Sequence, residues 1–127
     1  MAESVNSHPF NLAQSIQVQS GSVVSKTLVN KPGGTVTLFA FDAGQALSEH
    51  TAPYDALVII LEGEADVSIS GEWHHLKGGE SILMPANAPH ALNAASAYKM
   101  VLIMLKSYLT PDKTEAEKSA PVLSTRL

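Results

Sequence analysis

The sequence predicts an all-β domain, either a sandwich or a barrel. Short apolar runs recur through the middle of the chain and are separated by turns rich in Gly and Pro. None of them shows helical periodicity over a length that would build an α/β unit. With 127 residues, of which 45% are hydrophobic and 16% charged, the chain is long enough for one domain with a buried core.

The strands are expected between residues 23 and 105, where each apolar run ends at a turn signal. The expected strands are Val23–Val29, Thr35–Phe41, Leu57–Leu61, Ala65–Ser70, Trp73–Leu76, Ser81–Met84, Ala91–Asn93 and Met100–Leu105. The separators are Lys31–Gly34, Ala43-Gly44, Glu62–Glu64, Ser70-Gly71, Lys77–Gly79 and Pro85–Pro89. Many short strands with regular Gly/Pro punctuation are typical of a sandwich or barrel.

The two ends of the chain differ from this middle part. Residues 1–20 mix polar side chains with a few apolar ones, which predicts an arm with one weak helical turn or a short strand. Thr110-Pro111-Asp112 places proline at the first position of a helix, so a short solvated helix and a frayed end are expected. The predicted organisation is an N-terminal arm (1–20), a β-barrel domain (21–108) and a short helical or disordered tail (109–127).

The polarity of the strands indicates which faces are covered. Val67 and Ile69 alternate with polar neighbours, as expected for a strand with one wet face. Ala56–Leu61 and Met100–Leu105 are apolar without alternation, so both faces of these strands need cover. The N-terminal arm or a second subunit can supply the outer cover, and we expect a homodimer packed across a sheet.

Charge and the lack of targeting signals argue against nucleic acid and membranes as partners. The net charge is −4 and the eight basic residues are scattered, whereas a nucleic-acid binder needs a basic stripe. No basic segment followed by an apolar run opens the chain, so no secretory signal is expected. The longest apolar stretches are far shorter than the roughly 20 residues that cross a bilayer. We therefore expect a cytoplasmic protein that binds neither nucleic acid nor membrane.

The chain contains five histidines and no cysteine. The absence of cysteine excludes a disulfide scaffold, a thiolate zinc site and a cysteine nucleophile. His8 lies in the polar arm and is expected to be exposed and without a functional role. His50 and His90 each lie at a junction between a turn and a strand, where a β scaffold presents side chains to a cavity.

The residues that lead to His50 resemble the first motif of the cupins, a family of small double-stranded β-helix barrels. That motif consists of Gly, five residues, His-x-His, three or four residues, Glu, six residues and Gly. Here Gly44 and His50 match its beginning, and Gly63 matches its end.

The residues that lead to His90 resemble the second cupin motif. That motif consists of Gly, five residues, Pro-x-Gly, two residues, His, three residues and Asn. Here Gly79, Pro85 and His90 match, while Asn87 replaces the second glycine and Asn93 comes one residue early.

The resemblance extends over about residues 35–105 and implies a double-stranded β-helix, the cupin or jelly-roll barrel, with the arm and the tail outside it. His74 and His75 are successive on one expected strand and therefore point to opposite faces. In the family's pattern His74 shares its face with Leu76 and packs inward. His75 is then expected to face solvent or a subunit interface.

The resemblance also bears on metal binding. In a typical cupin, two histidines and a glutamate of the first motif and the histidine of the second hold one divalent metal. His50 and His90 match two of these positions, whereas Ala52 and Ala56 stand at the other two. Catalytic sites typically have three protein ligands. If a metal binds, we expect zinc, nickel or iron held by His50, His90 and water or a borrowed carboxylate.

Three polar side chains lie close to these motif positions. Asp55 and Glu49 are each adjacent to a motif residue and therefore point to the opposite face, unless a bulge turns them inward. Tyr54 is a candidate to hydrogen-bond a ligand or to orient an imidazole, and packing is an equally good role for it.

Two functions follow from these expectations. The first is binding of a small organic ligand inside an apolar barrel, with the two histidines as hydrogen-bonding groups. The resemblance implies a pocket lined by His50, Tyr54, Ala56, Val58, Ile60, Met84 and His90. The alternative is a metal-dependent cupin enzyme, such as a dioxygenase or isomerase, that uses His50 and His90.

Overall fold

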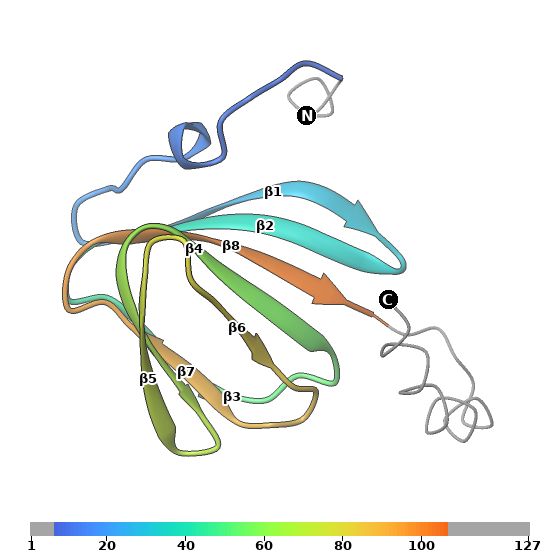
Figure 1. Cartoon of the computed structure of the whole chain (residues 1–127), viewed down its shortest axis with the longest axis vertical. Helices are drawn as coiled ribbons and strands as arrows, with labels where there is room; N and C mark the ends of the chain where they lie inside the picture. Colours follow the sequence, from blue (N-terminus) through green and yellow to red (C-terminus); the bar gives the residue numbers. More distant parts are fainter. Residues whose placement is uncertain (1–6, 107–127) are drawn as a thin grey trace.

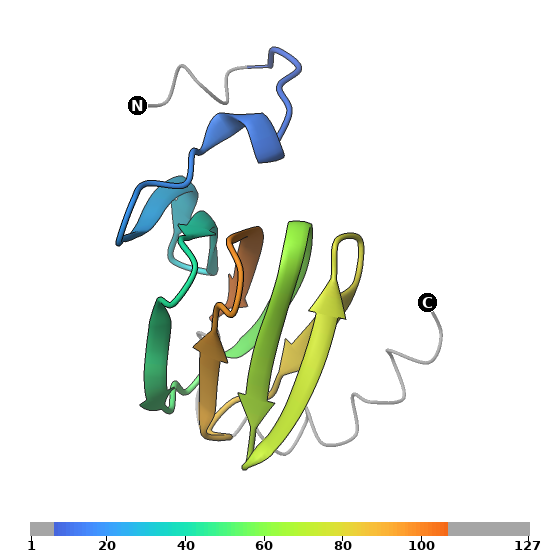
Figure 2. The ribbon, with the colours of Figure 1, turned by 90° about the vertical axis from the view of Figure 1, so that its left-hand side faces the viewer.

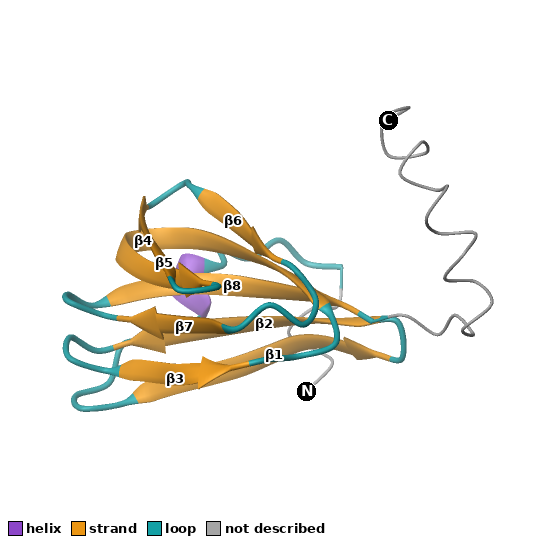
Figure 3. Cartoon of the chain, turned by 90° about the horizontal axis from the view of Figure 1, so that it is seen from below, coloured by secondary structure: helices purple, strands orange, loops and turns teal. Residues whose placement is uncertain are grey.

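A computed structural model describes residues 7–106 of the chain. Strands make up nearly all of its regular structure, and a single 3₁₀ turn, Ala13–Ser15, lies in the N-terminal arm (Figure 3). The strands are β1 (Val23–Lys31), β2 (Gly34–Phe41), β3 (Ala46–His50), β4 (Asp55–Ile69), β5 (Glu72–Lys77), β6 (Ser81–Met84), β7 (His90–Asn93) and β8 (Tyr98–Leu105). The described residues contain no helix long and apolar enough to cross a membrane.

The eight strands form one antiparallel sheet that curls over on itself (Figure 1). The strand order is β1-β2-β8-β4-β7-β3, and β5 and β6 both pair with β4. The first half of β4 pairs with β8 and β6, and its second half pairs with β7 and β5. This arrangement is the double-stranded β-helix of the cupin or jelly-roll type, so the predicted fold class is confirmed.

The course of β4 corrects one expectation from the sequence. Glu62–Glu64 was expected to separate two strands, but β4 runs without a break through 15 residues. The pairing register with β8 shifts between Ile60 and Glu62, and Gly63 adopts a φ of +85°. The signal at Gly63 marks a bulge that bends the strand from one half of the barrel to the other.

The sequence also missed β3. Its sequence, Ala-Leu-Ser-Glu-His, has little apolar character, and four of its five residues are exposed. The segment is extended because it pairs with β7 at the edge of the sheet. Backbone pairing of this kind leaves no hydrophobic pattern in the sequence.

The inward faces of the strands form the main core. Phe41 stacks on Tyr98 with ring centroids 4.6 Å apart and planes inclined by 14°, a favourable arrangement for an aromatic pair. The other buried members are Ala56, Val58, Ile60, Ala65, Val67, Leu76, Met84, Leu92, Ala94 and Met100.

The outward face of β2, β8 and β4 forms a second apolar cluster. Leu38, Ala40 and Val101 are buried there, and Ile16 of the arm is buried against them. The arm therefore supplies part of the outer cover that the central strands were expected to need. The Lys99 Nζ fastens the arm, because it donates a hydrogen bond of 2.7 Å to the Ala13 carbonyl oxygen.

The predicted tail 109–127 lies outside the described residues, as do residues 1–6 and 107–108. The predicted boundary between the arm and the barrel stays a prediction.

The bend of β4 leads to a testable prediction about Gly63. A Cβ at this position would lie 2.5 Å from the Ala97 carbonyl oxygen and 2.8 Å from the Tyr98 Cβ. Gly71 has nearly the same φ, +86°, but nothing lies within 4 Å of a Cβ there. We expect Gly63→Ala to lower the free energy of unfolding by about 3–5 kcal/mol and Gly71→Ala by about 1–2 kcal/mol. Urea unfolding measures both values, and equal losses would contradict the proposed role of the close contact.

Candidate functional site

His50 and His90 are brought together by the pairing of two short strands. His50 is the last residue of β3, His90 is the first residue of β7, and the two are register partners in this antiparallel pair. Their rings meet edge to face, with centroids 4.3 Å apart and planes inclined by 69°. The two Nε2 atoms are 3.1 Å apart. His90 is buried and His50 is exposed, so the pair can be reached from one side.

The hydrogen bonds of the other ring nitrogens define what the pair can do. The Nδ1 of His50 lies 3.0 Å from the Ser48 carbonyl oxygen, and the Nδ1 of His90 lies 3.0 Å from the Ala88 carbonyl oxygen. A carbonyl oxygen only accepts hydrogen bonds, so each Nδ1 carries the proton. In two neutral rings both Nε2 atoms are then acceptors, and neither can donate to the other. The pair therefore presents two convergent lone pairs that a hydrogen-bond donor or a cation would satisfy.

The remaining residues of the predicted pocket have two different environments. Ala56, Val58, Ile60 and Met84 are all buried in the main core. Tyr54 is half-buried, and the Lys106 Nζ lies 5.7 Å from the centroid of its ring. Whether these residues line a ligand pocket stays a prediction.

The residues around the pair do not complete a metal centre of the family's type. Among residues 7–106, no group of three or more His, Cys, Asp or Glu side chains is placed to hold a metal ion. Asp55 is not placed as a third ligand; its Oδ1 accepts the Ala86 N–H at 2.9 Å and holds the loop before His90. A site built here has two imidazoles and no carboxylate, which is fewer protein ligands than a typical catalytic centre has.

A second polar cluster, which the sequence did not predict, lies on the outer face of β4 and β5. The His75 Nδ1 lies 2.7 Å from Asp66 Oδ1, and its Nε2 lies 2.7 Å from Glu64 Oε1. The hydrogen bonds to Asp66 and then Glu64 raise the pKa of His75 above its usual 6.5. The expected exposure of His75 is confirmed. His74 is half-buried opposite Val67, on the inward face where it was expected.

The hairpin register explains why this cluster was missed. The Ser70-Gly71 turn pairs Asp66 with His75 and Glu64 with Lys77. Counting back from that turn would have placed a carboxylate directly opposite His75. The second carboxylate reaches the ring diagonally, which only the twist of the sheet decides.

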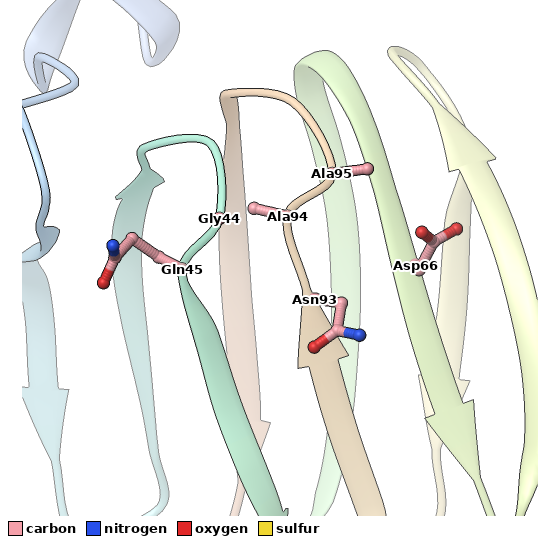
Figure 4. A pocket seen from close by; sticks show the side chains of 6 residues that line it. All are labelled: Gly44, Gln45, Asp66, Asn93, Ala94 and Ala95. Carbon is pink, nitrogen blue, oxygen red and sulfur yellow. The ribbon is translucent and has the colours of Figure 1, made fainter.

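Figure 4 shows a pocket of about 220 Å³ beside the start of β3 and the end of β7. The two histidines lie at the other ends of these strands. Asp66 contributes to its lining, so the pocket adjoins the His75 cluster. The other lining residues are Gly44, Gln45, Asn93, Ala94 and Ala95. No sequence motif indicates this pocket, because it arises where strands separate.

Tyr98 is the one buried side chain in the described part of the chain that lacks a partner for a polar atom. Its residue is 1% exposed and its hydroxyl makes no hydrogen bond. Burial raises the pKa of this phenol above its usual value, and the charge of Asp66 raises it further.

Comparison with known proteins agrees with this fold. Residues 37–106 match the model of the cupin domain. The chain belongs to the cupin family. This cupin is 33% identical over 79 residues to a pyrimidine/purine nucleoside phosphorylase of Geobacter metallireducens, covering 61% of this chain and 74% of that protein. It is 35% identical over 78 residues to the enzyme of the same name in Geobacter sulfurreducens, covering 60% and 73%.

Solved structures resemble it over most of its length. A conserved protein of unknown function from Streptococcus pyogenes has a TM-score of 0.78 and 35% identity, covering 82% of this chain and 91% of that one. A cupin superfamily protein from Desulfitobacterium hafniense has a TM-score of 0.76 and 28% identity, covering 80% and 94%. A cupin 2 conserved barrel protein from Leptotrichia buccalis has 44% identity and a TM-score of 0.75, covering 76% of this chain and 47% of that one.

The His75 cluster makes a prediction about pH. Because the folded pKa of His75 lies above 6.5, the cluster stabilises the fold fully below pH 6.5. This contribution disappears as the pH rises through the folded pKa. We expect the difference in unfolding free energy between the wild-type protein and His75→Gln to shrink over that interval. NMR titration of the His75 ring gives the pKa directly, and an Asp66→Asn variant that left it unchanged would contradict the assignment.

Proposed function

We propose that this cupin binds a small organic ligand at the end of the barrel where His50 and His90 meet. The observation that carries the proposal is the pair of convergent Nε2 atoms, 3.1 Å apart, each left as an acceptor by the hydrogen bond of its Nδ1. A ligand with N–H or O–H groups satisfies both acceptors at once. The alanines at positions 52 and 56 replace the polar ligands of the cupin motif and favour an apolar or aromatic ring beside those groups.

Nucleosides are the first ligand class to test. The phosphorylases of Geobacter that resemble this chain are named for purine and pyrimidine nucleosides. A nucleoside combines an aromatic base with N–H and O–H donors, which is the combination that an alanine-lined site with two imidazole acceptors suits. Phosphorolysis of the nucleoside by inorganic phosphate is then the reaction to assay.

The alternative is a metal-dependent cupin enzyme, such as a dioxygenase or isomerase. One observation favours it: histidines that ligate metals commonly donate their other ring N–H to a carbonyl or carboxylate, as His50 and His90 do. In this case zinc, nickel or iron would be held by His50, His90 and water or a borrowed carboxylate. The missing third protein ligand is the reason that we place this function second.

Calorimetric titration with uridine and adenosine tests the proposal. The loss of one hydrogen bond is worth about 1 kcal/mol, so we expect His50→Ala and His90→Ala each to weaken nucleoside binding about fivefold to tenfold. His8→Ala is the matched control, because His8 is an exposed histidine in the arm, and it should bind like the wild-type protein.

Metal analysis of the same preparations separates the two functions. Stoichiometric zinc, nickel or iron that disappears in a His50→Ala/His90→Ala double variant would support the enzyme. Nucleoside binding that both single variants leave intact would contradict the ligand site.

We also propose that the chain forms a homodimer through the outer face of its larger sheet. One apolar row crosses five strands from β6 to β1, each member being the register partner of the next. The row is Leu83, Leu57, Ile103, Val36 and Val29. Leu83 is 51% exposed and Val29 is 36% exposed.

A second copy of the chain suits this row better than the tail does. Five strands at about 4.8 Å spacing span roughly 19 Å, and a two-fold axis brings two such rows into contact without further elements. Residues 112–118 are rich in charge, so that segment of the tail offers little apolar cover.

Sedimentation analysis at micromolar concentration tests the dimer. Leu83 belongs to this row, and Leu105 lies two residues after Ile103 on β8 and so on the same face. The two side chains are 51% and 59% exposed, so Leu83→Arg and Leu105→Arg leave the barrel core intact. We expect both to convert a dimer to a monomer. Trp73→Arg is the control, since Trp73 is equally exposed (53%) on β5, which is not part of this row. A monomeric wild-type protein would refute the proposal.

A further inference from the structure

The pocket beside Asp66 exists because β4 changes partners. Asp66 pairs with Asn93 on β7, whereas Gly63 pairs with Tyr98 on β8. The chain crosses from β7 to β8 through residues 94–97, so β7 leaves β4 directly after the Asp66–Asn93 pair. Figure 2 shows this part of the barrel, with β3, β7, β4 and β5 side by side. The pocket is therefore a consequence of the topology, and Gly44, Ala94 and Ala95 line it together with polar side chains.

Asp66 on β4 and Asn93 on β7 both line this pocket and are register partners. The Asn93 amide extends from β7 toward β4, while the Gln45 amide points away from Asp66 (Figure 4). Asp66 uses Oδ1 for its hydrogen bond with His75, which leaves Oδ2 for a ligand. Directly opposed residues of an antiparallel pair have Cβ atoms about 5 Å apart. A carboxylate oxygen and an amide can therefore reach two adjacent atoms of the same molecule.

The orientation of Asp66 is fixed from the far side of the pocket. His75 bridges Asp66 and Glu64 with two contacts of 2.7 Å. His75 is thus a positioning residue, which holds the carboxylate in one rotamer without touching the ligand. Such prior orientation reduces the entropy that a ligand must overcome.

Ala94 and Ala95 keep the pocket open on the side of the β7–β8 crossing. At about 220 Å³ the pocket is smaller than the roughly 300 Å³ at which sites for drug-sized molecules begin, so it suits a single ring.

We infer that this pocket is a second binding site, specific for a sugar ring or similar cyclic polyol with adjacent hydroxyl groups. The Asp66 carboxylate accepts a hydrogen bond from one hydroxyl, and the Asn93 amide donates to the oxygen of the next. Charge-assisted hydrogen bonds of this kind are stronger than neutral ones, so Asp66 contributes most of the affinity. Asp66 is the single carboxylate among the residues that line the pocket, which favours a neutral polyol over a cation.

The site is independent of the histidine pair. His90 and Asn93 are the two ends of β7, so they are separated by about 10 Å along the strand. The two sites also open differently, since His90 is buried and Asn93 is exposed. Failure of one proposal leaves the other untouched.

NMR titration with D-ribose, D-mannose and D-galactose tests the inference. We expect saturable shifts of the backbone amides of residues 44, 66, 93 and 95 with at least one sugar. 2-Deoxy-D-glucose, which is D-mannose without its C2 hydroxyl, is the matched ligand control and should bind more weakly than D-mannose. The fluorescence of Trp73, the single tryptophan, gives a second readout. Trp73 lies on β5 and pairs with Ser68 of β4, which is two residues from Asp66.

Two variants keep the test decisive. We expect Asp66→Asn to weaken sugar binding about tenfold and Asn93→Ala about threefold to fivefold. Asn93 has no part in the His75 cluster, so its variant remains informative if Asp66→Asn perturbs the fold. Glu72→Gln, at an exposed position at the start of β5, is the control and should bind normally. The absence of saturable shifts at these four amides with all three sugars would overturn the inference, as would shifts confined to residues 48–50 and 88–90.

Discussion

The whole barrel depends on the pairing of β4. This 15-residue strand pairs with β8 and β6 in its first half and with β7 and β5 in its second half. A single extended strand can serve both halves only if it bends, and the bulge at Ile60–Glu62 with Gly63 at positive φ supplies that bend. The backbone of Ala97 and Tyr98 then lies against Gly63 so closely that no side chain fits. Every other strand is positioned relative to this one.

The bend also places the two polar sites at opposite ends of one short strand. β7 pairs with β3 on one side and with β4 on the other, and its first and last residues are His90 and Asn93. At its first residue the rings of two histidines converge, with their outer nitrogens fixed by carbonyl oxygens. At its last residue the strands separate and leave a pocket beside Asp66. The proposed ligand chemistry differs accordingly. At the first residue of β7 two imidazole nitrogens can accept from a donor or bind a cation, and at the last residue a carboxylate and an amide can bind a polar ligand.

The two outer faces of the sheet have different characters. The face of β2, β8 and β4 is apolar and is partly covered by the arm, which Lys99 holds through the Ala13 carbonyl. Lys99 itself is 7% exposed and lies 3.4 Å from Glu62, so its buried charge has a partner. The opposite face, on β4 and β5, presents Glu64, Asp66 and His75. An interface with a second copy therefore suits the first face, and a polar ligand suits the second.

The sequence alone determined the all-β class, most of the strands and the two histidines of the cupin motifs. These features follow from local patterns: Gly/Pro punctuation, apolar runs and motif spacing, all of which lie close together along the chain. Only the tertiary structure decided that β4 continues through Gly63, because a bulge and a turn begin with the same residue type. It also decided the convergence of the two Nε2 atoms, the use of Asp55 by the loop before His90, and the pocket beside Asp66. Each of these depends on contacts between residues more than 20 positions apart, and no local pattern encodes such a distance.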